Sequence, residues 1–212
     1  MALRLNGQTS GYVELDAPAV AGSNTLTLPN GNGSSGQVLS TDGSGGLSWQ
    51  TVTDTGAQWT SGTTQTLSGT SQLFDNIPSN AAYIEITFVA VSFNAAVNLA
   101  VQLGDSAGLE TSGYVSRSNA TSSVAGNITS GFEFNFIGAA SYSYSGYLKF
   151  RKHSGNTWVV EGMLALETAN DIMSFIGYKT LSDTLTQIQL YGTPSGGSFD
   201  AGTATIHYLT SS

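Results

Sequence analysis

Hydrophobic and polar residues alternate with a period of two through most of the chain after residue 80. Within residues 83–93, Ile84 and Ile86 fall on one face, and Glu85 and Thr87 fall on the other. This period is typical of a strand with one buried and one exposed face. Residues 93–96 form a short loop that returns the chain into Val97, so we expect a strand hairpin here.

The same alternation continues to the end of the chain, and no segment keeps a helical period over three turns. Further strands are predicted at residues 97–103, 114–117, 132–136, 144–152, 157–167, 172–180, 185–191 and 203–209. Strands of this length and spacing are typical of a sandwich of two sheets. The fold class predicted is all-β, with a C-terminal antiparallel β-sandwich of the jelly-roll type and no significant helix.

Three regions are expected along the chain. Residues 71–212 form the C-terminal β-sandwich, or knob, which begins near the turn at Ile77-Pro78 because proline cannot donate a backbone hydrogen bond. Residues 54–70 are polar apart from Trp59 and Leu67, and are interpreted as a linker or an edge strand. Residues 1–53 form an N-terminal stem or attachment segment.

The N-terminal segment consists of short apolar pieces separated by glycine-rich turns. The pieces are residues 12–15, 25–29, 37–40 and 47–49, and Asp42-Gly43 predicts a hairpin turn between the last two. Ordering a backbone costs about 1–2 kcal/mol per residue, and these pieces offer little apolar area to offset that cost. Another copy of the same chain is therefore the expected partner.

Composition narrows the function classes. Only 9% of the residues are charged and the formal net charge is −8, which disfavours nucleic acid as a partner because phosphate binding needs clustered Lys and Arg. Cysteine is absent, so disulfides and cysteine-metal sites are excluded. The start of the chain lacks the basic residues and apolar run of a secretory signal, and no apolar stretch approaches the ~20 residues of a membrane helix. Synthesis in the cytoplasm without membrane insertion is expected.

Catalytic and metal sites find little support. His153 is expected in a turn and His207 in a strand, far from each other in the sequence, and the glycine-rich residues 30–36 lack the Lys-Ser/Thr ending of a phosphate loop. A carboxylate pair of the glycosidase kind among Glu85, Glu133, Glu161 and Glu167 stays open, because only spatial separation decides it. We predict no cofactor, no metal and no enzymatic activity.

Tyrosine and serine give the better candidates for recognition. The segment 141–147 places three tyrosines among small residues, and a second Ser/Asn-rich stretch follows Tyr114. Tyrosine and serine suit adaptable binding surfaces, including stacking on sugar rings, although these tyrosines could equally cover the sandwich. The candidate binding residues on the knob surface are Tyr114, Arg117, Asn119, Tyr142, Tyr144, Tyr147 and His153.

An ordered set of short motifs runs from residue 71 to the end: Leu73-Phe74-Asp75-Asn76-Ile77-Pro78-Ser79, Val101-Gln102-Leu103-Gly104-Asp105, Leu109-Glu110-Thr111-Ser112-Gly113-Tyr114, Asn156-Thr157-Trp158-Val159, Lys179-Thr180-Leu181-Ser182 and Phe199-Asp200-Ala201-Gly202. This set resembles a C-terminal domain of bacteriophage tail-fibre-like proteins. Residues 11–15, 25–29 and 36–43 resemble a stem segment of phage fibres, notably marine ones.

The resemblance implies a homotrimeric β-structured fibre or spike in the virion. Its knob would bind a glycan or protein of the host cell surface, and residues 1–53 would contact other virion proteins. A full tail fibre usually carries a longer shaft than this chain has before its knob. Two alternatives therefore stay open: a head fibre or capsid decoration protein with a structural role, and a glycan-cleaving tailspike-like enzyme.

Overall fold

The computed structural model describes residues 2–20, 22–52, 56–120, 123–124, 128–135, 139–168, 171–194 and 196–210. The chain divides into two compact units, Met1–Thr55 and Gly56–Ser212. Throughout the described ranges the regular structure is strand without helix, so the predicted all-β class is confirmed. The described part of the chain contains no helix long and apolar enough to cross a membrane.

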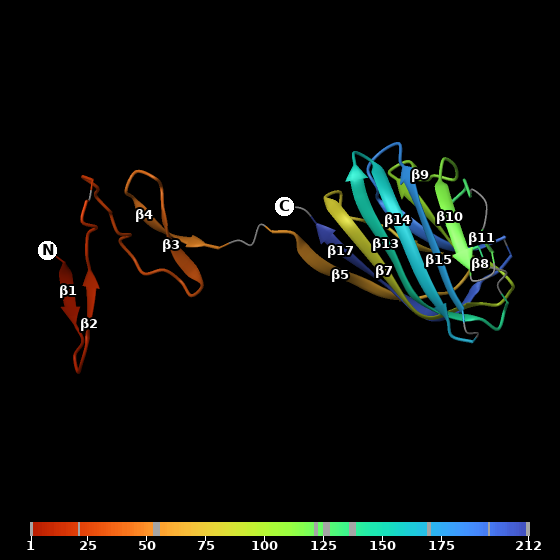
Figure 1. Cartoon of the computed structure of the whole chain (residues 1–212), viewed down its shortest axis with the longest axis horizontal. Coiled ribbons are helices and arrows are strands. Elements are labelled where there is room, and N and C mark those ends of the chain that lie inside the picture. The colour runs from red at the N-terminus through yellow and green to blue at the C-terminus, as the bar shows by residue number, and fades with distance from the viewer. Residues whose placement is uncertain are drawn as a thin grey trace. The chain divides into compact units, whose positions relative to one another are not determined.

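The first unit consists of two separate hairpins (Figure 1). Strand β1 (Leu3–Asn6) pairs antiparallel with β2 (Tyr12–Leu15), and β3 (Gln37–Thr41) pairs antiparallel with β4 (Leu47–Thr51). The second hairpin is the one that the Asp-Gly turn predicts, and Gly43 has a positive φ of 81° there. Strand β1 was not among the predicted pieces, although Leu3 and Leu5 alternate with Arg4. Residues 25–29 are not a strand, since they contribute only the isolated bridge between Thr27 and Gly46.

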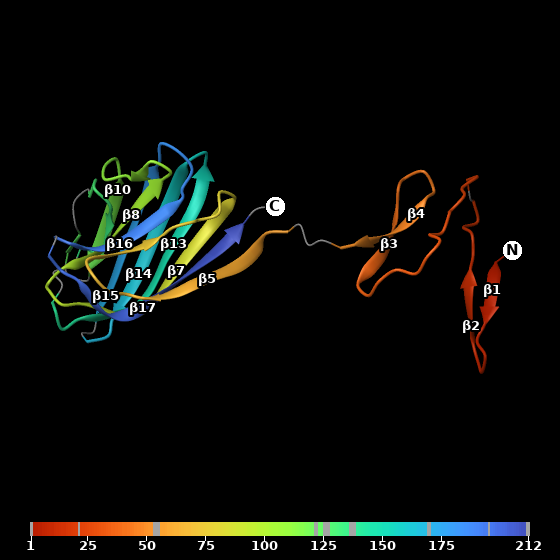
Figure 2. The same ribbon diagram turned by 180° about the vertical axis from the view of Figure 1, so that it is seen from behind.

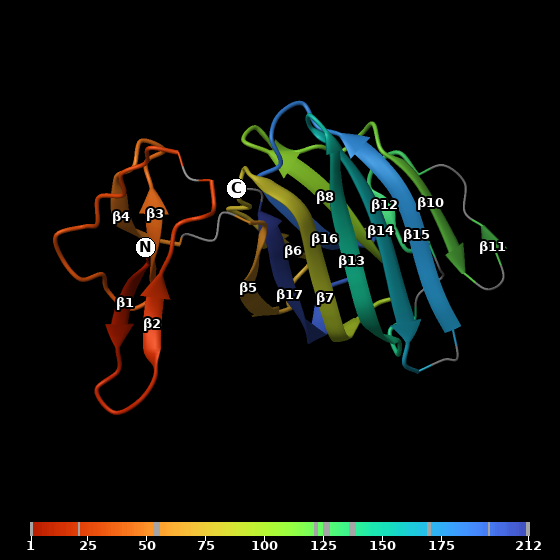
Figure 3. The same cartoon turned by 60° about the vertical axis from the view of Figure 1, so that its left-hand side comes forward.

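The second unit is built from two antiparallel sheets, and the larger has eight strands (Figures 1 and 3). In spatial order these strands are β11 (Ser123–Val124), β10 (Val115–Ala120), β15 (Asp171–Thr180), β14 (Thr157–Leu166), β13 (Ser143–Ser154), β7 (Ala81–Phe93), β17 (Phe199–Thr210) and β5 (Gln58–Thr66). Strand β5 forms the edge of this sheet, so the second unit includes residues that precede the predicted start of the knob at residue 71.

The smaller sheet lies behind the larger one and comes to the front in Figure 2. Its strands are β12 (Phe132–Glu133), β8 (Asn98–Asp105), β16 (Gln187–Thr193) and β6 (Ser71–Phe74), with β9 (Gly108–Leu109) attached to β8. The predicted strand at residues 132–136 is shorter in the structure, and its last residue, Phe136, lies outside the described residues.

The order of strands is that of a jelly roll. Four strands of the larger sheet, β5, β17, β7 and β13, stack on four strands of the smaller sheet, β6, β16, β8 and β12, and the chain passes repeatedly between the two. Such an arrangement of two Greek keys buries one face of each sheet. Strands β14, β15, β10 and β11 widen the larger sheet beyond β13.

The core lies between the sheets and follows the period-two pattern. Ile84, Leu148 and Val160 are fully buried, whereas the residues next to them in sequence point to the other face of the larger sheet. Gly162 on β14 is also buried, and a Cβ there would come within 2.8 Å of Phe134, Phe175 and Leu148. The glycine thus leaves room for the aromatic rings, since cores are packed without spare volume.

Candidate binding surface

The face of the eight-stranded sheet that points away from the core is called the outer face. Its residues line up in rows, because the register places one residue of each strand beside the next. The first row is Val115, Tyr178, Val159, Arg151, Tyr83, Leu209 and Trp59, and the second row is Arg117, Ile176, Glu161, Lys149, Glu85, His207 and Ser61. The third row begins at Asn119 and includes Met163 and Tyr147.

Several large apolar side chains of the outer face are exposed. Ile176 is 58% exposed, Trp59 57%, Tyr178 47% and Met163 43%. Trp59 and Tyr83 contact each other edge to face, with ring centroids 5.3 Å apart. Exposed apolar groups concentrated on one face of a soluble domain indicate an interaction surface.

Charged side chains of both signs lie among these apolar groups. Arg151 donates to Glu161 over 3.0 Å, and Lys149 lies between Glu161 and Glu85 in the second row. The Nζ of Lys149 also lies 4.2 Å from the ring centroid of Tyr147. Three of the six Lys and Arg residues of the chain are on this face: Arg117, Lys149 and Arg151.

The phenol of Tyr83 belongs to the same charged network. Its burial, followed by the negative charge of Glu85, raises the pKa of Tyr83 above the ordinary value. The hydroxyl therefore stays protonated at neutral pH and is available as a donor. It lies 3.4 Å from the carboxylate of Glu85.

Three of the seven candidate binding residues lie on the outer face. Arg117 and Asn119 are exposed on β10, and Tyr147 is half-buried on β13. Arg117 and Asn119 line a shallow hollow of about 200 Å³ together with Ser174 and Ile176 of β15. The register puts β15 and β14 between Asn119 and Tyr147, so these two residues are not in contact.

Tyr114 is not a surface residue, and this expectation is wrong. Its side chain is 1% exposed, and its ring contacts Phe132 edge to face. The hydroxyl accepts from the backbone N–H of Leu103 and donates to the carbonyl of Glu110, each over 2.8 Å. Burial raises the pKa of Tyr114, so the hydroxyl stays a donor and joins β8 to the segment that follows β9.

The Tyr/Ser segment 141–147 is used mainly inside the fold. Tyr144 is 3% exposed, which corrects its placement on the knob surface, and burial raises the pKa of Tyr144 to about 12. Tyr142 is half-buried and packs against the core. Ser143 and Ser145 both donate to the carboxylate of Glu167, and these hydrogen bonds, that of Ser145 first, lower the pKa of Glu167.

His153 is exposed, as expected for a surface candidate, but it belongs to β13 rather than to a turn. The turn between β13 and β14 consists of Gly155 and Asn156 alone, and Gly155 adopts a positive φ of 52°. The register between β13 and β14 shifts between Lys152, which pairs with Trp158, and Ser154, which pairs with Thr157. His153 lies at this irregularity.

A polar cluster holds the turn that follows β8. Lys179 is buried and forms an ion pair with Glu110, while the hydroxyl of Ser182 lies 2.6 Å from Asp105 and 2.9 Å from Glu110. The hydrogen bond from Ser182 is the largest of the effects that lower the pKa of Asp105. These contacts fasten residues 105–110 to the loop after β15, and their role is structural.

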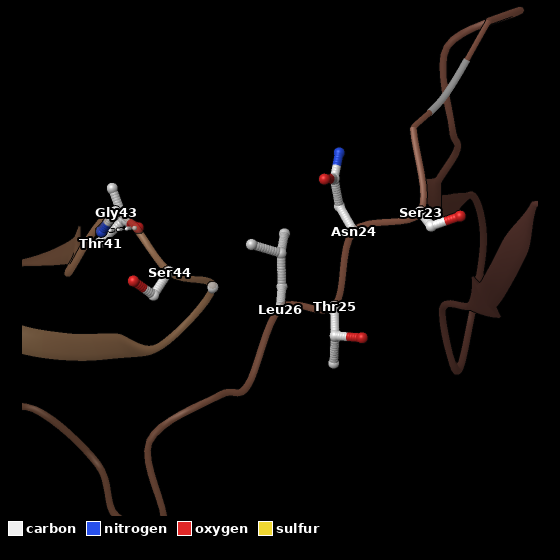
Figure 4. A pocket seen from close by; sticks show the side chains of 8 residues that line it. Ser23, Asn24, Thr25, Leu26, Thr41, Gly43 and Ser44 are labelled. Atoms are coloured by element: carbon white, nitrogen blue, oxygen red, sulfur yellow. Dashed lines mark hydrogen bonds between the residues drawn. The ribbon is translucent and has the colours of Figure 1, made fainter.

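A groove of the first unit lies between residues 23–26 and the tip of the β3–β4 hairpin (Figure 4). In this view the side chains of Leu26 and Asn24 point upward, and that of Thr25 points the opposite way. Thr41 accepts a hydrogen bond from the N–H of Gly43. The lining consists of small polar residues, glycines and Leu26, without an ionisable side chain among its described residues.

The outer face was not recognised from the sequence as one surface. The alternation assigned Glu85, Glu161 and Lys149 to the faces opposite the buried residues, but Ile176 and Met163 were not singled out. The alternation itself could have indicated these residues, since each follows or precedes a buried residue in its strand.

Within the described ranges, no group of three or more His, Cys, Asp and Glu residues could hold a metal ion. Neither a protein-family model, nor a curated protein, nor a solved structure matches the chain.

Proposed function

We propose that this protein is a structural appendage of a bacteriophage virion, a homotrimeric fibre or spike. In this proposal the first unit assembles copies and attaches them to other virion proteins. The jelly roll is the knob that contacts a glycan or protein of the host surface. The resemblance of the motifs between residues 71 and 202 to phage fibre domains supports the class of protein.

One observation carries the assembly part of the proposal: none of the described residues of Met1–Thr55 is buried. The second unit, in contrast, has a continuous core of aromatic and aliphatic side chains. A hairpin of two short strands is at best marginally stable alone in water. The first unit therefore needs a partner that covers its apolar groups.

The β1–β2 hairpin presents its four aliphatic side chains on a single side, whereas Tyr12 lies on the other side with Arg4. Leu3 pairs with Leu15 and Leu5 with Val13, and all four side chains are between 57% and 66% exposed. The other side carries the ion pair between Arg4 and Glu14 over 2.8 Å. An uncharged apolar side of this kind fits the same side of a second and third copy, because identical surfaces recur around a symmetry axis.

The test of assembly is the mass of the full chain by native mass spectrometry and sedimentation. Three copies are expected for the unmodified chain. The variant Val13→Asp places a charge on the apolar side and is expected to dissociate the assembly, while Asn6→Asp adds the same charge to the opposite side and is expected to leave it intact. A monomer at micromolar concentration for the unmodified chain contradicts the proposal.

The location is tested separately with antibodies raised against the purified chain. Immunogold labelling of phage particles that encode the chain is expected at the tips of tail appendages. Labelling over the capsid instead supports the head fibre or decoration alternative. Absence of the chain from purified particles rules out a virion function altogether.

A further inference from the structure

The two sheets of the jelly roll have outer faces of different chemistry. The smaller sheet presents Gln102, Gln187, Gln189 and Tyr191, and Leu73 is its single exposed large apolar residue among those described. The eight-stranded sheet presents most of the exposed apolar side chains of the second unit. The outer face of the smaller sheet is polar and suited to contact with water, whereas that of the eight-stranded sheet is apolar enough to favour a protein partner.

We propose that the outer face of the eight-stranded sheet is an interface between knobs, covered by a second copy of this chain. The proposal rests on the proposed function, in that it assigns a surface to the contact between knobs of one assembly. It concerns residues 56–212 and is independent of the contact made by the β1–β2 hairpin.

The arrangement of charge favours a second copy over other partners. Glu161, Lys149 and Glu85 follow one another on β14, β13 and β7 in the same row. Around a three-fold axis each copy meets its neighbour through a different part of its surface, and a row that carries both signs lets a lysine of one copy meet a carboxylate of the next. A polyanionic partner would instead meet both glutamates at the centre of the face, and like charges in an interface are unfavourable.

The apolar groups flank this charged centre on both sides. Ile176, Tyr178 and Met163 lie on β15 and β14, and Trp59 lies at the other end of the sheet on β5. Interfaces commonly combine aromatic anchors with charged groups that fix the register. The charges then fix how neighbouring copies are positioned against each other, and the apolar groups contribute most of the contact.

The absence of cysteine from the sequence permits a direct test by thiol labelling. Ser174→Cys places one thiol on the outer face, and Gln189→Cys places a matched thiol on the outer face of the smaller sheet. Both positions are half-buried in the isolated chain. In the assembled full chain, the thiol at position 174 is expected to react with a maleimide at least about tenfold more slowly than the thiol at position 189, because the core of an interface excludes water.

Two further measurements separate the possible outcomes. Combining Ser174→Cys with Ile176→Asp is expected to restore fast labelling of the thiol without loss of the thermal unfolding transition. Combining Ser174→Cys with Leu73→Asp, which changes the other sheet, is the matched control and is expected to leave the labelling slow. Equal labelling of the two thiols in a chain whose mass is that of a trimer overturns this inference and leaves the proposed function standing. Protection that persists at dilutions where the chain is monomeric also overturns it, because residues of the same chain then cover the face.

Discussion

The ammonium of Lys179 and the carboxylate of Glu110 form an ion pair in which the lysine side chain is 6% exposed and the glutamate side chain 22%. The pair joins the end of β15 to the segment after β9. Burial acts to raise the pKa of Glu110, but the hydrogen bonds from Lys179 and Ser182 and the charge of Lys179 outweigh it, so the pKa is lowered.

The lowered pKa of Glu110 predicts a loss of stability in acid. A carboxyl group whose pKa is lower in the folded state stabilises the fold above its unfolded pKa of about 4.3, and this contribution is lost as the pH falls through the folded value. Urea unfolding of the unmodified chain between pH 7 and pH 3 is expected to show this loss. Glu110→Gln is expected to cost about 3–5 kcal/mol at pH 7, because it leaves a buried ammonium without its counter-charge.

The double variant Glu110→Gln with Lys179→Met is the control for this experiment. Replacing both members of a buried pair is often nearly neutral, so the double variant is expected to be more stable than Glu110→Gln alone. It should also unfold with a weaker dependence on pH between pH 3 and pH 5. Equal stability of the single and double variants would show that the ammonium is not buried in solution.

Gly162→Ala is expected to destabilise the jelly roll by about 1–3 kcal/mol through overpacking. The added methyl group would lie 2.5 Å from the ring of Phe134 and 2.6 Å from that of Phe175, which is about 1 Å closer than the favourable separation of two carbon atoms. Thermal unfolding measures the effect. A substitution at Gly43, in an exposed turn with open space around its Cβ, serves for comparison and should not lower the melting temperature of the second unit.

The variant Tyr114→Phe tests whether the hydroxyl of Tyr114 stabilises the fold or takes part in binding. Removing the hydroxyl leaves the buried N–H of Leu103 without its acceptor, which is expected to cost about 1–3 kcal/mol. Under the proposed function, binding to host cells is expected to be unchanged at temperatures where the variant is folded. Loss of cell binding by a stably folded variant would return Tyr114 to the list of binding residues.

Two truncations test where the second unit begins. A chain starting at Gly56 keeps β5 and is expected to fold cooperatively, as measured by circular dichroism and resistance to protease. A chain starting at Ser71 loses β5 and the side chain of Leu67, which is 2% exposed. Its melting temperature is expected to be lower, because burial of a leucine contributes about 1.5–3 kcal/mol and the pairing of β5 with β17 is lost as well.

The period-two pattern predicted most long strands of the second unit, because burial between two sheets imposes that period directly on the sequence. The hairpin expected between residues 83–93 and 97–103 is wrong, since β7 and β8 lie in different sheets and do not pair. The placement of Tyr114 and Tyr144 on the knob surface was wrong, since the candidates were grouped by composition and not by face. Tyr114 and Arg117 are three residues apart, as are Tyr144 and Tyr147, so in a strand each pair points to opposite faces. One member of each pair is buried.

The rows of the outer face could not be predicted from the sequence. They depend on register between strands far apart in the chain, such as Lys149 beside Glu85 and His207 beside Ser61. Alternation within a strand says which face a residue occupies, but it says nothing about its neighbours across the sheet. The pairing of β5 with β17 was missed for the same reason, because β5 is largely polar and exposed.

Strand β17 lies between β7 and β5 and is hydrogen-bonded to both. It also follows every other described strand in the sequence, so the ribosome releases the strand that connects β5 to the rest of the larger sheet after all the others. Until β17 has been made, β5 has no neighbour in that sheet and one edge of β7 has no strand to pair with. The jelly roll therefore closes only after synthesis has passed residue 210. A nascent chain arrested before Phe199 has the six strands from β11 to β7 of the larger sheet, but it lacks the strand that pairs β5 with them.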